Sequence, residues 1–168
     1  MSIHRAMAEL KRITVTISDM KASADRNSYL ITHSLGSCIG LVAYDPKVMV
    51  GALLHFQLPD SGNHGRRAQE NPFMFADTGI PLFLRKLYSL GAHKDRMVFG
   101  MFGGANMLDD EELFKIGIKN ARATKKILWQ QSISVRHEDV GGHASRTVSL
   151  EIGTGGVGLR KDGKLYTI

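Results

Sequence analysis

The sequence predicts an α+β fold, a single-domain layered sandwich of mostly antiparallel strands with two main helices. The chain has 168 residues, of which 43% are hydrophobic and 23% are charged, a size and composition typical of one globular domain. Strand periodicity recurs in several short segments, whereas helical periodicity appears in only two. The short links between strands suit hairpins better than a doubly wound parallel sheet. We therefore expect residues 1–168 to form one domain, with residues 1–10 as an N-terminal extension.

The expected strands are short apolar or alternating segments bounded by turn residues. Residues 12–19 alternate Ile13, Val15 and Ile17 on one face, the period of a half-buried strand. Two apolar runs are separated by Asp45-Pro46-Lys47, and Pro favours the first central position of a turn, so they predict a β-hairpin. The predicted strands are 12–19, 28–34, 38–45, 48–56, 95–105, 132–138 and 146–152, with a closing hairpin over 156–168.

Two segments carry helical signals. Residues 77–91 place apolar side chains at helical spacing, and Gly91 is positioned to end the helix. Residues 109–131 are acidic at the start and basic towards the end, which matches the helix dipole and predicts a second helix in one or two pieces. The polar, glycine-containing stretch 61–70 is expected to be a loop.

Composition excludes several classes of protein. No apolar run approaches the roughly 18 residues of a membrane span, and the N-terminus lacks the apolar region of a secretory signal, so we expect a cytoplasmic protein without membrane insertion. A single cysteine permits no internal disulfide, which suits a reducing compartment. The net charge is +6, and the densest basic cluster, Lys119 to Lys126, is typical of a solvated helix face. No groove-reading or aromatic motif accompanies this cluster, so nucleic acid is not expected as a partner. Attraction to an acidic protein surface explains the positive charge at least as well.

Two apparent ligand motifs are weak. Gly153, Gly155 and Gly158 have the spacing of a dinucleotide fingerprint, but only ten residues follow, too few for the helix and strand that such a site needs. His137 and His143 flank a glycine loop rather than sharing a helix face, so a surface role is favoured over a metal site. We expect no metal and no organic cofactor.

The only cysteine, Cys38, has a histidine partner in the predicted hairpin. If the turn is centred between Pro46 and Lys47, Cys38 and His55 lie directly opposite each other with Cβ atoms about 4.5–5.5 Å apart. A histidine next to a thiol can accept its proton and so activate it as a nucleophile. A one-residue bulge would break this register, and a lone cysteine among apolar residues is more often a packing residue.

Two further positions, Thr32 and Ser37, complete the hypothesis. Thr32, on the preceding strand, is a candidate to orient the imidazole, and strand alternation points the neighbouring His33 to the opposite face. The backbone amides of Ser37 and Cys38 follow a glycine and are candidates for stabilising an oxyanion.

Six motifs in a fixed order carry a resemblance: LGSC at 35–38, YDP at 44–46, HFQLP at 55–59, FGGAN at 102–106, IGIKN at 116–120 and DVGGHASR at 139–146. The sequence resembles the chemoreceptor glutamine deamidase family, CheD, over roughly Val15 to Arg160. The resemblance implies that Cys38 is the nucleophile, His55 the base and Thr32 the third member of a triad. It also implies one CheD-like domain with a layered fold related to the catalytic domain of cytotoxic necrotizing factor toxins.

The reaction implied by the resemblance is hydrolysis of glutamine side chains of methyl-accepting chemotaxis receptors to glutamate through a γ-glutamyl thioester. Two alternatives remain open: a binding module that stimulates a CheC-type chemotaxis phosphatase, and a receptor glutamate methyl esterase that uses the same thiol. Leu54 departs from the polar residue that many relatives place before the histidine, and the loop from Asp60 to Asp77 is a variable region; both bear on substrate preference.

Overall fold

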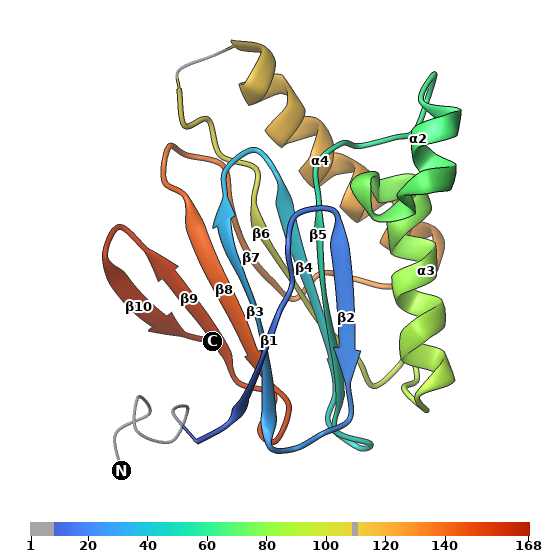
Figure 1. The fold of residues 1–168 in the computed structure, drawn as a ribbon, viewed down its shortest axis with the longest axis vertical. Coiled ribbons are helices and arrows are strands. Elements are labelled where there is room, and N and C mark those ends of the chain that lie inside the picture. Colours follow the sequence, from blue (N-terminus) through green and yellow to red (C-terminus); the bar gives the residue numbers. More distant parts are fainter. Residues whose placement is uncertain (1–8, 109–110) are drawn as a thin grey trace.

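The computed structural model of the chain describes residues 9–108 and 111–168, so most of the predicted N-terminal extension, residues 1–10, lies outside the described residues. The predicted fold class is confirmed: the chain is an α+β sandwich with mostly antiparallel strands (Figure 1). The strands are β1 (Lys11–Thr14), β2 (Asp19–Ser23), β3 (Ser28–Leu35), β4 (Ile39–Asp45), β5 (Val50–Phe56), β6 (Val98–Gly103), β7 (His137–Val140), β8 (Arg146–Glu151), β9 (Val157–Lys161) and β10 (Lys164–Thr167). The helices are α2 (Gly65–Glu70), the 3-10 turn η1 (Pro72–Met74), α3 (Ala76–Ser89) and α4 (Glu111–Gln130).

The strands form two sheets of five. The outer sheet has the order β1-β3-β8-β9-β10, and the central sheet has the order β2-β5-β4-β6-β7. Parallel pairing occurs between β1 and β3 and between β6 and β7; the other strand pairs in the described chain are antiparallel. Because α4 connects β6 to β7, this second parallel pair is joined by a helical crossover, as parallel neighbours require.

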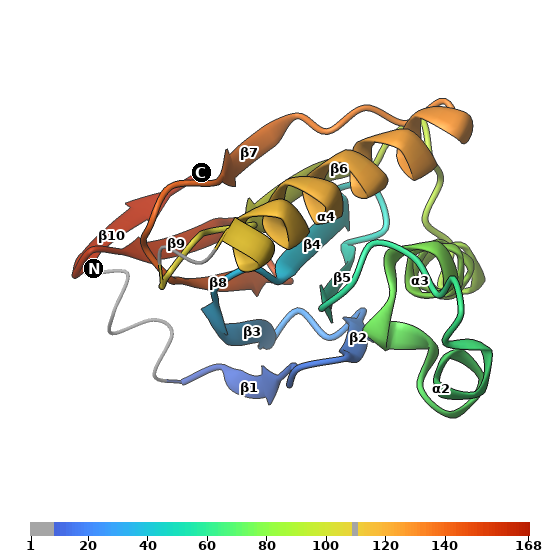
Figure 2. The ribbon, with the colours of Figure 1, turned by 90° about the horizontal axis from the view of Figure 1, so that it is seen from above.

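Two apolar cores hold three layers together. Every residue of β4 and β5 is buried because the central sheet is covered on both faces, by the outer sheet and by the helices α3 and α4 (Figures 1 and 2). The core between the sheets includes Leu30, Val42, Leu53, Phe102, Val148 and Leu150. The core between the central sheet and the helices includes Leu41, Leu54, Phe56, Ile80, Phe83 and Leu128.

Three local predictions were wrong. The alternation in residues 12–19 predicted one strand, but the chain crosses from the outer to the central sheet here, ending β1 at Thr14 and starting β2 at Asp19. Ser18 takes a positive φ of 55° in the crossing, and Ile17, expected to be buried, is 55% exposed. The predicted loop 61–70 contains the short helix α2, which buries none of its residues and therefore has no apolar period to reveal it.

The strand predicted over residues 132–138 is also mostly absent: residues 133–136 have no regular secondary structure, and β7 begins only at His137. Its apolar alternation arises because Ile133 and Val135 pack against the core beside the helices without pairing as a strand. The other predicted elements are present. The hairpin of β4 and β5, both long helices and the closing hairpin of β9 and β10 lie where the periodicity placed them, and α4 is one continuous helix. The glycines in the GTGGVG stretch form the turn between β8 and β9 rather than a nucleotide-binding turn before a helix.

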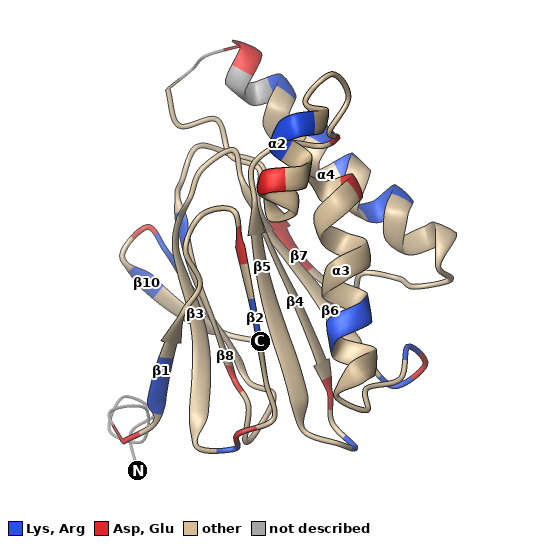
Figure 3. Ribbon diagram, turned by 45° about the vertical axis from the view of Figure 1, so that its right-hand side comes forward, with Lys and Arg blue, Asp and Glu red and all other residues tan. Residues whose placement is uncertain are grey.

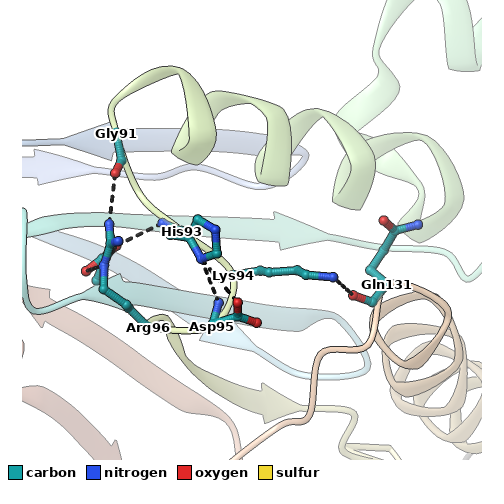
Figure 4. A network of polar contacts seen from close by, with 7 residues as sticks. Gly91, His93, Lys94, Asp95, Arg96 and Gln131 are labelled. Atoms are coloured by element: carbon teal, nitrogen blue, oxygen red, sulfur yellow. Dashed lines mark hydrogen bonds and ion pairs between the residues drawn. The ribbon is translucent and has the colours of Figure 1, made fainter.

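A buried carboxylate fastens the lower end of the central sheet to the segment after α3. The Asp45 side chain, at the end of β4, is fully buried and accepts hydrogen bonds from Arg96 and from the backbone N–H of His93 and of Lys47. Burial alone would raise the pKa of Asp45, but these hydrogen bonds outweigh it and hold the pKa below its ordinary value. Figure 4 shows the same segment reaching its surroundings through Arg96 to the carbonyl of Gly91 and through Lys94 to Gln131.

Replacing Asp45 with Ala is expected to lower the free energy of unfolding by about 2–4 kcal/mol, because it leaves Arg96 and two backbone donors without their acceptor. Urea denaturation measures the change. The control is Asp95→Ala, whose side chain forms an exposed ion pair with His93 and is expected to matter by no more than about 0.5 kcal/mol. Equal losses in the two variants would contradict the assignment.

Candidate active site

The hairpin that carries Cys38 and His55 has a different register from the predicted one. Asp45 pairs with Val50, so the turn contains four residues, Pro46 to Met49, and Met49 closes it with a φ of 52°. His55 consequently lies opposite Gly40, and the predicted direct pairing of Cys38 with His55 is wrong. The longer turn, rather than a bulge, accounts for the shift.

The register differs from the predicted one by two residues. Because side chains alternate between the two faces of a strand, a shift of two residues leaves each side chain on its predicted face. Gly40 and His55 both face the outer sheet, as do Val42 and Leu53 two positions further along. Cys38 precedes β4 and packs against the same core, half-buried at its end. The thiol and the imidazole are therefore diagonal neighbours at one end of the space between the sheets.

Thr32 reaches the imidazole from the opposite sheet. It lies on β3 with its side chain fully buried, and its Oγ1 is 2.7 Å from His55 Nδ1. The same hydroxyl donates to the carbonyl of Val15 at 2.7 Å. A hydroxyl has one proton, so towards His55 it is an acceptor, and Nδ1 must carry the ring proton. The neutral imidazole therefore presents the lone pair of Nε2.

Gly40, opposite His55, lies close to two side chains of β3. A Cβ at this position would lie 2.8 Å from Leu35 Cδ1 and 3.6 Å from Thr32 Cγ2. A larger residue opposite His55 would thus require the Leu35 side chain to move. The predicted orientation of His33 is confirmed, since His33 is exposed on the other face of β3 and bonds Arg12.

Burial favours the neutral forms of both His55 and Cys38. His55 is only 3% exposed, and burial lowers its pKa to about 4. Burial raises the pKa of the Cys38 thiol to about 11, although its own backbone N–H acts in the opposite direction. Nε2 of His55 is buried and has no hydrogen-bond partner within residues 9–108 and 111–168. His55 thus has an Nε2 lone pair that no described group occupies, on the face of the sheet to which Cys38 also belongs.

The loop of Gly36, Ser37 and Cys38 is held in place by hydrogen bonds to its carbonyl groups. A bulge between Thr32 and Leu35 turns the end of β3 into the loop of Gly36, Ser37 and Cys38. The carbonyl of Gly36 accepts from Ala105 N at 2.7 Å, and that of Cys38 from Gly104 N at 2.9 Å.

The third carbonyl of this loop is held by a helix. Asn120 of α4 donates through Nδ2 to the carbonyl of Ser37 at 2.9 Å and to that of Gln57 at 2.8 Å. Within the described chain, the Ser37 N–H has no partner and the Cys38 N–H faces its own sulfur. Of the two backbone amides predicted to stabilise an oxyanion, that of Ser37 therefore has no competing acceptor in the described chain, whereas that of Cys38 is directed at its own thiol.

Two residue types that sequence reasoning did not single out support this loop. Gly103 has a φ of 116°, and a Cβ there would overlap the carbonyl oxygen of Cys38, so only glycine fits. Arg146 is 1% exposed, pairs with Asp139, and donates to the carbonyls of Gly103 and Gly141. Both lie in motifs quoted above for the resemblance, but neither has a spacing that reveals its role.

The sequence also raised His137 and His143 as possible metal ligands. His143 bonds the carbonyl of Asn106 through Nδ1, and His137 begins β7. Across the described residues, no group of three or more His, Cys, Asp or Glu side chains could hold a metal ion. Likewise, none of the helices in the described ranges is both long enough and apolar enough to cross a membrane.

Comparison with known proteins identifies the family. Residues 57–161 match the family model described as CheD chemotactic sensory transduction. The chain is 46% identical to a probable chemoreceptor glutamine deamidase CheD of Syntrophus aciditrophicus, over 90% of this chain and 94% of the relative. The chain belongs to the CheD family. A CheD relative from Solibacter usitatus is 44% identical over 92% of both chains, and one from Pyrococcus horikoshii is 40% identical over 90% of this chain and 93% of its own.

These alignments span the site. The first covers 151 of the 168 residues, so at most 17 lie outside it, and Thr32, Cys38 and His55 fall within it wherever it starts. The region matched by the CheD family model begins after His55 and contains the supporting residues Gly103, Asn120 and Arg146 instead.

The buried imidazole predicts acid sensitivity. An unfolded histidine takes up a proton near its ordinary pKa of 6.5, whereas folded His55 does so only near 4. Between these values the unfolded state binds more protons, so folding stability falls as the pH falls. Through His55 alone, we expect the free energy of unfolding to fall by about 2 kcal/mol from about pH 7 to about pH 5. Urea denaturation at both pH values measures this change. His55→Gln lacks this contribution; an unchanged pH slope in that variant would exclude His55 as its source.

Proposed function

We propose that this chain is a chemoreceptor glutamine deamidase, a protein-glutamine glutaminase in which Cys38, His55 and Thr32 act as a catalytic triad. The observation that carries the proposal is the hydrogen bond of Thr32 to His55 Nδ1, because it leaves the lone pair of Nε2 on the face that also carries the only thiol. The printed names of the relatives supply the substrate class, glutamine side chains of chemoreceptors.

The first half of the reaction forms a thioester. The Cys38 sulfur attacks the side-chain carbonyl carbon of a glutamine while Nε2 of His55 takes the thiol proton. The backbone N–H groups of Ser37 and Cys38 bind the oxyanion that develops. The tetrahedral intermediate then collapses, the C–N bond breaks, and the imidazolium returns its proton to the departing ammonia.

The second half consumes water. His55 deprotonates a water molecule, whose oxygen attacks the γ-glutamyl thioester; the C–S bond breaks and Cys38 regains a proton. The products are glutamate and ammonia, so one water is used for each amide hydrolysed. These steps use protein groups only, and Thr32 keeps the ring in one tautomer throughout.

The neutral resting pair sets the order of events. With the pKa of Cys38 at about 11 and that of His55 at about 4, proton transfer from sulfur to nitrogen is uphill in the free protein. The attack and the proton transfer are therefore coupled, and a bound amide with its oxyanion contacts drives both. The resting thiol is protected from oxidation because the thiolate is the reactive form.

The cytoplasm is the compartment we propose for this activity. A free, half-buried thiol is maintained in reducing surroundings, and the reaction requires it.

Incubation with a chemoreceptor fragment, followed by peptide mass spectrometry, tests the proposal. Conversion of glutamine to glutamate is expected at defined sites. Cys38→Ala is expected to lower the rate by about 10³-fold or more, and Thr32→Val by about 10- to 100-fold because the imidazole loses its orienting acceptor. His33→Ala, next to Thr32 but on the other face of β3, is the matched control and should keep the wild-type rate.

Other outcomes point to the two alternative functions. Loss of a methyl group from receptor glutamates, without change at glutamine, would identify an esterase that uses the same thiol. Stimulation of a CheC-type phosphatase that persists in Cys38→Ala, without any change in the receptor, would identify a binding module. Either result alone would overturn the deamidase proposal.

A further inference from the structure

One exposed face of α4 carries a straight row of cations that ends in a tryptophan. We call this row the α4 stripe, and its positions follow the spacing four, three, four, three, which places them along one side of a helix. All of its side chains are exposed (Figure 3, blue segments on α4). The α4 stripe consists of Lys115, Lys119, Arg122, Lys126 and Trp129.

Most of this charge is not neutralised within the protein. Lys115 pairs with Glu112 at 3.1 Å, but Lys119, Arg122 and Lys126 form no ion pair with any residue that the structure describes. The stripe extends over about 21 Å, since a helix rises about 1.5 Å per residue. An array of this length and sign attracts an acidic surface of matching length.

The stripe leads into an apolar groove. Trp129 is 78% exposed, an unusual value for a large aromatic side chain. It lines a hollow of about 590 Å³ together with Ile133, Val135 and Lys126. Tryptophan and arginine are enriched at protein interfaces, where a few such residues carry much of the binding energy.

We propose that the α4 stripe and its groove bind an acidic helix of a protein partner, with carboxylates along the stripe and one apolar side chain in the groove. A helix laid along α4 presents side chains with the same spacing as the stripe, so each carboxylate can meet a cation. Protein fits better than nucleic acid because Ile133 and Val135 line the groove beside Trp129 and can receive an apolar side chain, which a nucleic-acid backbone does not offer.

Trp129 is the only tryptophan of the chain, so its fluorescence reports on this surface without a label. The probe is a designed helical peptide of about 20 residues with glutamate at the stripe spacing and one leucine anchor. Binding is expected to shift the Trp129 emission to shorter wavelength, and to weaken as salt rises from about 0.05 to about 0.5 M. The double variant Lys119→Glu with Arg122→Glu is expected to lower the affinity about tenfold or more.

Three controls decide the outcome. The peptide with glutamine in place of glutamate should not shift the emission, and Lys164→Glu, an exposed change on β10, should bind like the wild type. A single-stranded oligothymidylate of equal charge should also leave the emission unchanged. No shift with the acidic helix, or an equal shift with the oligonucleotide, would overturn the proposal.

A separate observation concerns Asn120, on the inner face of the same helix. Its side chain is fully buried and donates to the carbonyls of Ser37 and Gln57, while its Oδ1 has no partner in the described part of the chain. α4 is seated closely here, since a Cβ at Gly117, one turn earlier, would lie 2.6 Å from the carbonyl oxygen of Gly104. Burying an amide whose oxygen has no partner lowers the stability of the fold. The two hydrogen bonds that Asn120 donates are therefore the evident reason for its position.

We infer that Asn120 is a positioning residue that orients the Ser37–Cys38 peptide. In a trans peptide the C=O and the following N–H point in opposite directions. Holding the Ser37 carbonyl towards α4 therefore turns the Cys38 N–H away from α4, to the side where its own sulfur lies. The inference rests on the proposed function, because this N–H matters only if an oxyanion forms there.

The variant pair Asn120→Leu and Thr124→Val tests this role. Leucine keeps the volume and removes the donors; Thr124 lies one turn further along the buried face of α4, and its hydroxyl bonds only the carbonyl of Asn120. In Asn120→Leu, kcat for deamidation is expected to fall about 10- to 100-fold with KM within about twofold, since the contact acts on the transition state. Thr124→Val should keep kcat although it also loses a buried hydrogen bond.

A second measurement separates this inference from the deamidase proposal. The Cys38 N–H lowers the thiol pKa, so alkylation of Cys38 by iodoacetamide across pH should be slower in Asn120→Leu and its apparent pKa higher. If the wild type deamidates nothing, the proposed function fails, and the alkylation profiles still test the positioning. Unchanged profiles and kcat, or an equal loss of kcat in Thr124→Val, would overturn it. Should Asn120→Leu not fold, Asn120→Ala serves in its place.

Discussion

The site depends on one hydroxyl group that connects three segments. Thr32 donates its proton to the carbonyl of Val15 and accepts the Nδ1 proton of His55. Val15 lies where the chain crosses between the sheets, Thr32 is in the outer sheet, and His55 is in the central sheet. A buried hydroxyl with both partners satisfied fixes the ring in one tautomer, so the packing of one sheet on the other determines which nitrogen can act as a base.

Close to this contact, the loop of Gly36, Ser37 and Cys38 is held in place by other parts of the fold. This loop belongs to neither sheet, yet its three successive carbonyl groups accept hydrogen bonds from Ala105, Asn120 and Gly104. These supports come from the end of β6 and from α4, which are themselves fixed by glycine contacts and by the buried Arg146. The backbone amides of this loop are thereby fixed in direction, which is the preorganisation that the proposed oxyanion contacts would require.

The sequence predicted the fold class and the pairing of β4 with β5 because buried alternation and a proline turn are local signals. It placed Cys38 and His55 on one face but in the wrong register, since nothing local distinguishes a two-residue turn from the four-residue turn that Met49 closes. The partnership of Thr32 with His55 was expected, whereas Asn120 was not. Asn120 acts through a backbone carbonyl 83 positions away in the chain, and such a contact leaves no periodicity to detect.

The crossing at Val15 has a consequence for how firmly the tautomer of His55 is held. β1 has only four residues, all of them at least partly exposed, and pairs with one neighbour at the margin of its sheet. Such an edge opens by local fluctuation at a lower free energy than global unfolding. When it does, the carbonyl of Val15 leaves Thr32, whose proton is then free to turn towards His55 and compete for Nδ1. Local opening of the peripheral strand β1 would thus allow both ring tautomers of His55 while the rest of the sandwich stays folded. The edge of the outer sheet would then be the first part of the structure whose loss affects the site.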